Sequence, residues 1–159
     1  MNQKFLLCSI ALSGLIIFQA CNSGTNSSDK TASDSNASSN NSSVSTNPKG
    51  IGKYQNVQLT HPLDEKMVVA GKNIYDVKCA SCHKTTGEKL VGPGWKGVTD
   101  RRTPEWIMNF VTNTDEMIEK DTAAQKLLEV CLVKMPNQSL AEADARSVLE
   151  FMRKNDGKQ

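Results

Sequence analysis

The sequence is poor in aromatic residues and carries little net charge of either sign. Phe, Trp and Tyr make up 5% of its 159 residues, and hydrophobic residues of all kinds make up 38%. A chain of this length is expected to form one domain with accessory segments, and so few apolar side chains give that domain a modest core. The formal net charge of +2 is too small to indicate a nucleic-acid-binding protein. We therefore predict one small domain that does not bind nucleic acid.

The sequence also has no apolar run of the about 20 residues that a transmembrane helix needs. Its longest run, Phe5 to Phe18, follows Lys4 and is typical of the apolar region of a secretory signal peptide. Ala20 before Cys21 resembles the lipobox of bacterial lipoproteins, in which the cysteine is lipidated and becomes the first mature residue. We predict a lipoprotein signal peptide over residues 1–20 and a lipid on Cys21 that anchors the protein to a membrane without spanning it. The alternative is an ordinary secretory signal that leaves Cys21 as an odd thiol.

Residues 22–47 have almost no apolar side chains. Ser, Asn and Thr dominate this stretch, with a few Asp, Ala, Gly and Lys. Such a segment buries too little apolar surface to offset the entropy cost of ordering, so we predict that it is disordered. Pro48, Gly50 and Gly52 mark its end. The predicted domains are thus a lipidated cysteine with a flexible tether over residues 21–52 and a folded domain over residues 53–157.

The folded region has helical periodicity and no credible strand, so we predict an all-α domain. Gly92, Pro93, Gly94 and Gly97 predict a loop from Leu90 to Val98. The expected helices run from Asp64 to Lys78, from Thr103 onward, from Asp121 to about Leu132, and from a capping box at Ser139–Glu142 to near the C-terminus.

Each predicted helix has an apolar face. On the first helix this face is expected to hold Gly71, whose place in mid-helix costs about 1 kcal/mol relative to alanine and indicates close approach of another backbone. The expected faces are Met67, Ala70, Gly71 and Ile74 on the first helix, Ala124, Leu127, Leu128 and Cys131 on the third, and Ala145, Val148, Leu149 and Met152 on the last.

A Cys-x-x-Cys-His run, Cys79-Ala-Ser-Cys82-His83, follows the first predicted helix. This spacing is typical of c-type haem attachment, in which each thiol adds to a vinyl group and the histidine offers a ring nitrogen to the iron. A thioredoxin-like redox centre would follow a strand, and a zinc site would need a second Cys/His pair. The preceding residues look helical, and the other cysteines and His61 form no suitable pair. Haem attachment is therefore favoured.

With these features in place, residues Lys66 to Lys154 resemble a class I, monohaem cytochrome c. The resemblance implies four to five helices packed around one haem c, which is bound covalently through Cys79 and Cys82 and ligated by His83. In that family, a helix glycine packs against an aromatic residue of the C-terminal helix. Gly71 and Phe151 match this pair.

The resemblance also implies the surroundings of the iron. The family has a Gly-Pro pair after the haem motif, matched by Gly92-Pro93, whose carbonyl accepts the second ring N–H of the axial histidine and raises its basicity. The family has a Met-Pro pair before the last helix, matched by Met135-Pro136. Met135 is therefore the implied second axial ligand, and its neutral thioether favours the reduced iron.

Five other residues have predicted roles near this site. Trp95 is expected to line the haem pocket, although core packing with an indole hydrogen bond is the more frequent role of a tryptophan. Arg101 or Arg102 is expected to pair with a haem propionate, because arginine suits bidentate contacts with carboxylates. Met117 lies in a polar stretch and is a weaker rival ligand. Cys131 is expected to be a buried inert thiol, with an intermolecular disulfide or iron ligation as alternatives.

Two protein ligands leave iron no open position, so the resemblance implies an electron carrier rather than an enzyme. We expect a monomeric, lipid-anchored, periplasm-facing protein of the cell envelope, on the inner or the outer membrane. Its expected donor is a quinol-oxidising complex, and its expected acceptor is a terminal oxidase or a periplasmic reductase such as nitrous oxide reductase. The alternatives are a haem-based small-ligand sensor or peroxidase with an open distal site, and a cytochrome subunit of a larger oxidoreductase.

Overall fold

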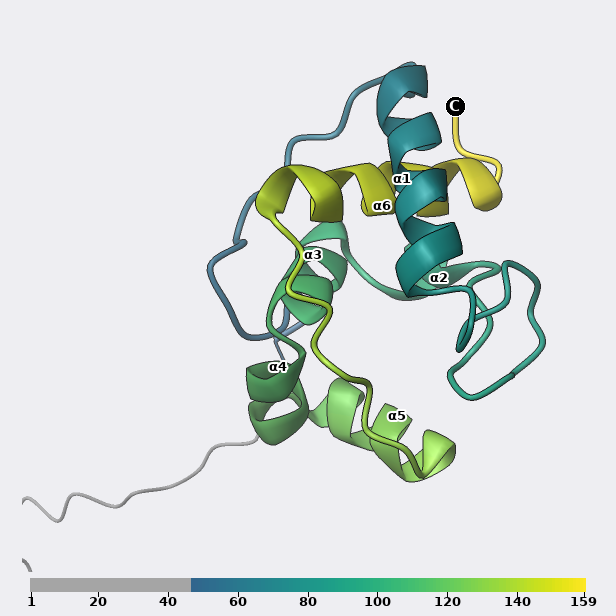
Figure 1. Ribbon diagram of the computed structural model, residues 1–159. Helices are drawn as coiled ribbons and strands as arrows, with labels where there is room; N and C mark the ends of the chain where they lie inside the picture. The colour runs from purple at the N-terminus through teal and green to yellow at the C-terminus, as the bar shows by residue number, and fades with distance from the viewer. Residues whose placement is uncertain (1–46) are drawn as a thin grey trace, which may run out of the picture. The chain divides into compact units, whose positions relative to one another are not determined.

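The computed structural model describes residues 47–159, and this part of the chain contains α-helices and no strand (Figure 1). The helices are α1 (Glu65–Lys78), α2 (Val98–Arg101), α3 (Pro104–Thr112), α4 (Thr114–Lys120), α5 (Thr122–Cys131) and α6 (Glu142–Asn155). The all-α prediction is confirmed, with six helices in place of the four to five expected, because the short helices α2 and α4 were not foreseen. The predicted signal peptide, Cys21 and most of the tether lie outside the described residues. No helix within residues 47–159 is long and apolar enough to cross a membrane.

Helix α1 crosses α6 (Figure 1). It begins as predicted after Asp64, whose side chain accepts hydrogen bonds from the amides of the first turn. Its buried residues are Val68, Gly71 and Tyr75, so the predicted face is right at Gly71 and one residue off elsewhere. A β-carbon at position 71 would overlap the backbone carbonyl of Ser147 on α6. The close approach of the two backbones thus fixes which side of α1 is buried.

Helix α3 begins at the predicted residue, whereas α6 begins later than predicted. Thr103 caps α3 by accepting a hydrogen bond from the Trp106 amide at 3.2 Å. The predicted capping box of α6 is wrong, because the helix begins at Glu142 with Ala141 at the N-cap position and no side-chain cap. The Glu142 carboxylate instead accepts a hydrogen bond from Lys53 Nζ at 2.9 Å. The predicted apolar face of α6 is fully buried and forms the centre of the core.

The segment before α1 packs against α3 and α4. The side chain of Asn109 is buried and makes three hydrogen bonds to this segment: Nδ2 donates to the carbonyls of Lys49 and Tyr54, and Oδ1 accepts from the Tyr54 amide. Gly50 is also buried, with φ of 70°, and it lies against Met117. The packed domain therefore starts a few residues before Lys53. The sequence analysis placed the start of the domain at Lys53 itself.

Candidate functional site

The Cys-x-x-Cys-His run forms a tight turn directly after α1. The amides of Cys82 and His83 both donate to the Cys79 carbonyl, at 3.0 and 2.9 Å, which brings the two thiols and the imidazole to one place. Cys79 is buried, Cys82 is half-buried, and neither forms a disulfide. Burial raises the pKa of the Cys79 thiol to about 11. Because neither cysteine forms a disulfide, both sulfur atoms are available for attachment of a cofactor.

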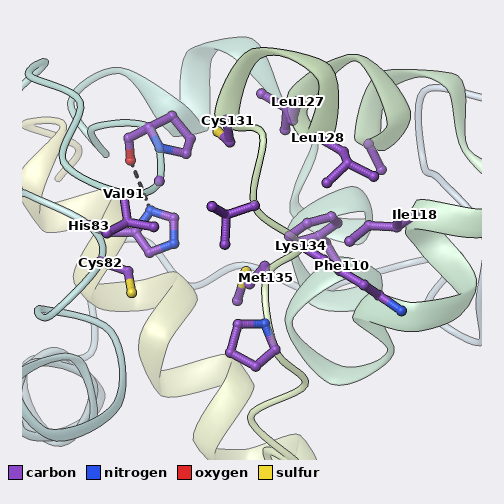
Figure 2. Close-up of a pocket in the computed structure, with 15 residues that line it drawn as sticks. Cys82, His83, Val91, Phe110, Ile118, Leu127, Leu128, Cys131, Lys134 and Met135 are labelled. Carbon is purple, nitrogen blue, oxygen red and sulfur yellow. Dashed lines mark hydrogen bonds between the residues drawn. The ribbon is translucent and has the colours of Figure 1, made fainter.

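His83 is held by two residues from different parts of the chain. Its Nδ1 donates a hydrogen bond to the Pro93 carbonyl at 2.9 Å (dashed line in Figure 2), the contact that the family resemblance implies. The Tyr75 hydroxyl donates to the His83 carbonyl at 2.7 Å. Burial lowers the pKa of His83, while its hydrogen bond to Pro93 partly opposes that shift. The imidazole is therefore neutral near pH 7 with Nε2 unprotonated, the form that binds a metal.

Gly92 adds a steric requirement to this arrangement. A β-carbon at position 92 would overlap the imidazole ring of His83. The Gly92 amide also donates to the Cys82 carbonyl at 2.9 Å, which ties the loop back to the motif. Only a glycine lets the backbone pass this close to the ring.

An apolar cavity opens in front of His83, and Figure 2 shows the side chains around it. It encloses about 580 Å³, including space open to solvent. The predicted apolar face of α5 forms one wall, and the loop before α6 brings in Met135. The lining residues are Cys82, His83, Val91, Gly92, Pro93, Phe110, Ile118, Ala124, Leu127, Leu128, Cys131, Val133, Lys134, Met135 and Pro136.

A second apolar cavity of about 690 Å³, again including space open to solvent, shares His83, Pro93, Phe110, Leu127 and Met135 with the first. Buried Trp95 forms part of its wall, as expected, with its ring centroid 5.7 Å from that of His83. The two cavities meet at the residues that the sequence analysis assigned to the iron.

Both predicted arginines line the second cavity. Arg101 donates to the Lys96 carbonyl at 2.7 Å and to the Gly94 carbonyl at 3.4 Å. Arg102 lies over the ring of Trp106, with Cζ 4.6 Å from the centroid. Their positions are compatible with a carboxylate partner inside the cavity, and the pairing with a propionate stays a prediction.

Two sulfur-containing residues differ from their predicted environments. Met117 is fully buried, accepts a hydrogen bond from the Ile51 amide at 3.0 Å, and lines neither cavity, so it is not a rival to Met135. Cys131 is half-buried and lines the first cavity, whereas the sequence analysis placed it as a buried core thiol. Its side chain faces the cavity because it continues the apolar face of α5.

Phe110 is the most central of the cavity residues that sequence reasoning missed. Phe110 lines both cavities and stacks on Trp106, with ring centroids 4.9 Å apart. Its spacing of four residues from Trp106 placed it on an apolar helix face, but periodicity does not distinguish a face that covers a cavity from one that covers the core.

The residues present fit a haem c. The Cys82 thiol, the neutral imidazole of His83 and the thioether of Met135 line cavities with few polar atoms, and the Cys79 thiol lies in the same turn as Cys82 and His83. Residues 47–159 contain no cluster of three or more His, Cys, Asp or Glu side chains that could hold a separate metal ion.

Comparison with known proteins agrees with this chemistry. The family model for cytochrome c matches residues 68–156. A solved structure of a cytochrome c from Rhodothermus marinus is similar, with a TM-score of 0.65 and 30% sequence identity over 68% of this chain and 92% of that one. An engineered cytochrome c from the same organism has a TM-score of 0.64 and 28% identity, over 67% and 92% of the two chains. A search of curated proteins gives no match. The chain belongs to the cytochrome c family, whose members bind haem c covalently through cysteines and carry electrons.

Proposed function

We propose that this protein carries single electrons through one haem c attached at Cys79 and Cys82, with His83 and Met135 as the two axial ligands. The observation that supports this best is that His83 and Met135 line the same two cavities although His83 follows α1 and Met135 lies in the loop before α6. When bound, the haem supplies the one-electron chemistry of its iron, and the protein sets its potential and access.

The protein's own residues orient and enclose the cofactor. The Pro93 carbonyl accepts a hydrogen bond from Nδ1 of His83, which leaves Nε2 facing the cavity. This hydrogen bond fixes the orientation of the ring and raises its basicity. The thioether of Met135 is a neutral ligand and favours the reduced state. The apolar side chains of α5 and Phe110 line the space between these ligands. This arrangement suits a carrier that changes charge without exchanging a ligand.

A rim of exposed aliphatic side chains supports docking of a redox partner near the cofactor. We define the apolar rim as Leu90, Val91, Val130, Leu132 and Val133, whose exposed fractions run from 40% to 85%. Val91 and Val133 also line the first cavity, so the rim lies at its mouth. Contiguous exposed apolar surface commonly marks an interaction site.

Lysine side chains flank this rim. Lys89 Nζ donates to the Val130 carbonyl at 2.8 Å and so joins the loop after the haem motif to α5. Lys134 pairs with Asp115 at 2.6 Å beside the cavity. An acidic, partly apolar partner surface would match this face. We propose a quinol-oxidising complex as donor and a terminal oxidase or a periplasmic reductase as acceptor, nitrous oxide reductase being one candidate.

Electron exchange with quinol-oxidising membranes tests the carrier role and its docking face. Val130→Asp places a charge in the apolar rim, and Val69→Asp places the same charge on α1 at a valine of similar exposure, 60% against 65%. Rapid mixing of the oxidised protein with such membranes should show at least tenfold slower reduction of Val130→Asp. Val69→Asp should react like the wild type. Equal rates for the two variants would contradict docking at the rim, and a wild-type protein that accepts no electrons from the membranes would contradict the carrier role.

We further propose that a lipid on Cys21 holds the protein at the periplasmic face of a membrane. Tethering would raise the effective concentration of the carrier near membrane-bound partners. Fractionation of cells that produce wild-type protein or Cys21→Ala tests this. The wild type should sediment with membranes and the variant should be soluble, whereas membrane association of both would contradict the lipid anchor.

A further inference from the structure

The C-terminal end of α6 holds the loop that carries Pro93. Asp156, the C-cap residue of α6, uses both of its carboxylate oxygens. Oδ1 accepts from the Gly97 amide at 2.6 Å, and Oδ2 accepts from the Thr99 amide at 2.8 Å and the Thr99 hydroxyl at 2.7 Å. Three hydrogen bonds thus join the helix end to a loop 57 to 59 positions earlier in the chain.

Helix α2 depends on this contact. It has four residues, and its N-cap is Gly97, which has φ of 72° and no side chain to cap the first turn. An isolated turn of this length is unstable in water, and its first amides need acceptors. Asp156 supplies these acceptors from another helix. The position of α2 is therefore set by the end of α6.

Asn155 holds the other side of the same loop. We call residues 84–85 the first limb of the loop and residues 95–99 the second limb, which Asp156 contacts. Asn155 Nδ2 donates to the Thr85 carbonyl at 3.0 Å. The two limbs also bond to each other, since the Trp95 amide donates to the Lys84 carbonyl at 2.8 Å. Pro93 lies between the two limbs in the chain, and its carbonyl accepts the hydrogen bond from Nδ1 of His83. Two consecutive residues at the end of α6 thus fix both sides of the loop that positions this carbonyl.

We propose that Asp156 is a positioning residue for the haem ligand His83. By fixing Gly97 and Thr99, it sets where the Pro93 carbonyl meets Nδ1 of the imidazole. The inference rests on the proposed function only in taking His83 as an iron ligand. A stronger hydrogen bond at Nδ1 makes the imidazole a more basic ligand, which favours the ferric state. Loosening the loop weakens this bond and raises the reduction potential.

Two simpler roles for Asp156 predict different results. If Asp156 only stabilises the fold, its loss lowers stability and leaves the potential unchanged. If Asp156 acts only through its negative charge, another carboxylate at the same place in the fold has the same effect. Asp100 is such a carboxylate: it lies on α2, is exposed, and contacts Lys158 at 2.5 Å.

The test compares four variants of the haem-loaded protein. Asp156→Asn removes the charge and one acceptor, Asp100→Asn removes the same charge nearby, and Thr99→Val removes only the hydroxyl that donates to Asp156. Reduction potentials come from redox titration, and hydrogen exchange at the Gly97 and Thr99 amides comes from NMR. We expect faster exchange and a higher potential in Asp156→Asn than in Asp100→Asn, and in Thr99→Val than in the wild type. Thr99→Ser, which keeps the hydroxyl, should restore both values.

Two results would overturn the proposal. One is faster exchange at Gly97 and Thr99 with a potential equal to that of Asp100→Asn, which would make Asp156 a stabilising contact alone. The other is unchanged exchange, which would show that the loop does not depend on Asp156. Thr99→Val provides the test if Asp156→Asn does not fold. The wild-type ferric spectrum reports independently on ligation by Met135. A failure of the proposed His/Met ligation is therefore distinguishable from a failure of the proposed positioning role of Asp156.

Discussion

Gly71 of α1 lies directly against the backbone carbonyl of Ser147 on α6, with no room for a β-carbon between them. This contact brings Tyr75 next to Phe151, with ring centroids 5.4 Å apart. Tyr75 in turn donates its hydroxyl hydrogen bond to the His83 carbonyl. The crossing of the two helices thus positions the haem motif that follows α1.

Gly71→Ala should therefore destabilise the protein. The added methyl group must push apart two backbones, which costs about 1–3 kcal/mol, and a backbone contact this close places the cost at about 3 kcal/mol. Alanine's better helix propensity offsets about 1 kcal/mol of this cost. We expect a loss of about 2 kcal/mol in the free energy of unfolding measured with urea. Gly87→Ala is the matched control, because a β-carbon at position 87 meets no atom within 4 Å. Equal stability of the two variants would contradict the close helix contact.

Gly92→Ala should disturb the haem site while leaving the helix core intact. A β-carbon at position 92 displaces the imidazole of His83 and breaks its hydrogen bond to Pro93. We expect a large loss of covalently attached haem, or an altered ferric spectrum in the fraction that retains it, measured by haem absorbance per protein. Gly87→Ala lies in the same loop and should attach haem normally. Normal haem content and spectrum in Gly92→Ala would show that the ring is not held in this way.

Glu150→Gln should cost about 3 kcal/mol of stability, because it leaves buried arginine without a charge partner. The fully buried Glu150 carboxylate accepts from Arg153 at 2.8 Å and from Arg146 at 2.5 Å. Glu65→Gln is the control, since Glu65 of α1 pairs with Lys154 of α6 at 2.9 Å on the surface. That exposed pair should contribute less than about 1 kcal/mol. Urea unfolding of both variants measures the difference, and similar losses would refute the role of the buried cluster.

The same carboxylate predicts how stability depends on pH. Burial alone would raise the pKa of Glu150, but hydrogen bonds from Arg146 and Arg153 outweigh it and hold the pKa below its ordinary value. The ionised group therefore stabilises the folded state above the ordinary pKa of about 4.3, and this contribution is lost as the pH falls through the lowered value. Thermal unfolding should show a gap between wild type and Glu150→Gln that is widest near about pH 7 and narrows in acid. A gap that is constant with pH would contradict the shift.

Local signals in the sequence predicted much of this domain. Asp64 and Thr103 marked the starts of two helices, because each side chain bonds to amides within its own first turn. The third predicted helix start, at Asp121, also has a side-chain cap in the structure. The haem motif placed His83 through the chemistry of attachment and ligation. The Gly-Pro and Met-Pro pairs placed Pro93 and Met135 through the family resemblance.

Features that depend on distant contacts were not predictable. Helix α2 is capped by Asp156 from the far end of the chain, and no residue near α2 indicates this. The capping box at Ser139 fitted the local pattern, but Glu142 pairs with Lys53 instead. Asn109 donates a hydrogen bond to the carbonyl of Lys49, a residue that was assigned to the tether because Pro48, Gly50 and Gly52 indicate a loop there. In each case a tertiary contact outweighed the local preference.

The central claim is that His83 and Met135 are the two ligands of the iron, and the absorption spectrum of the ferric protein tests it most directly. We predict a low-spin spectrum with a methionine–iron charge-transfer band that is unaffected by added small ligands. Met135→Ala should abolish the band, and Met67→Ala should retain it, because Met67 lies on α1 and lines neither cavity. A high-spin wild-type spectrum that shifts when small ligands are added, or a band that survives in Met135→Ala, would contradict the claim and favour an open distal site.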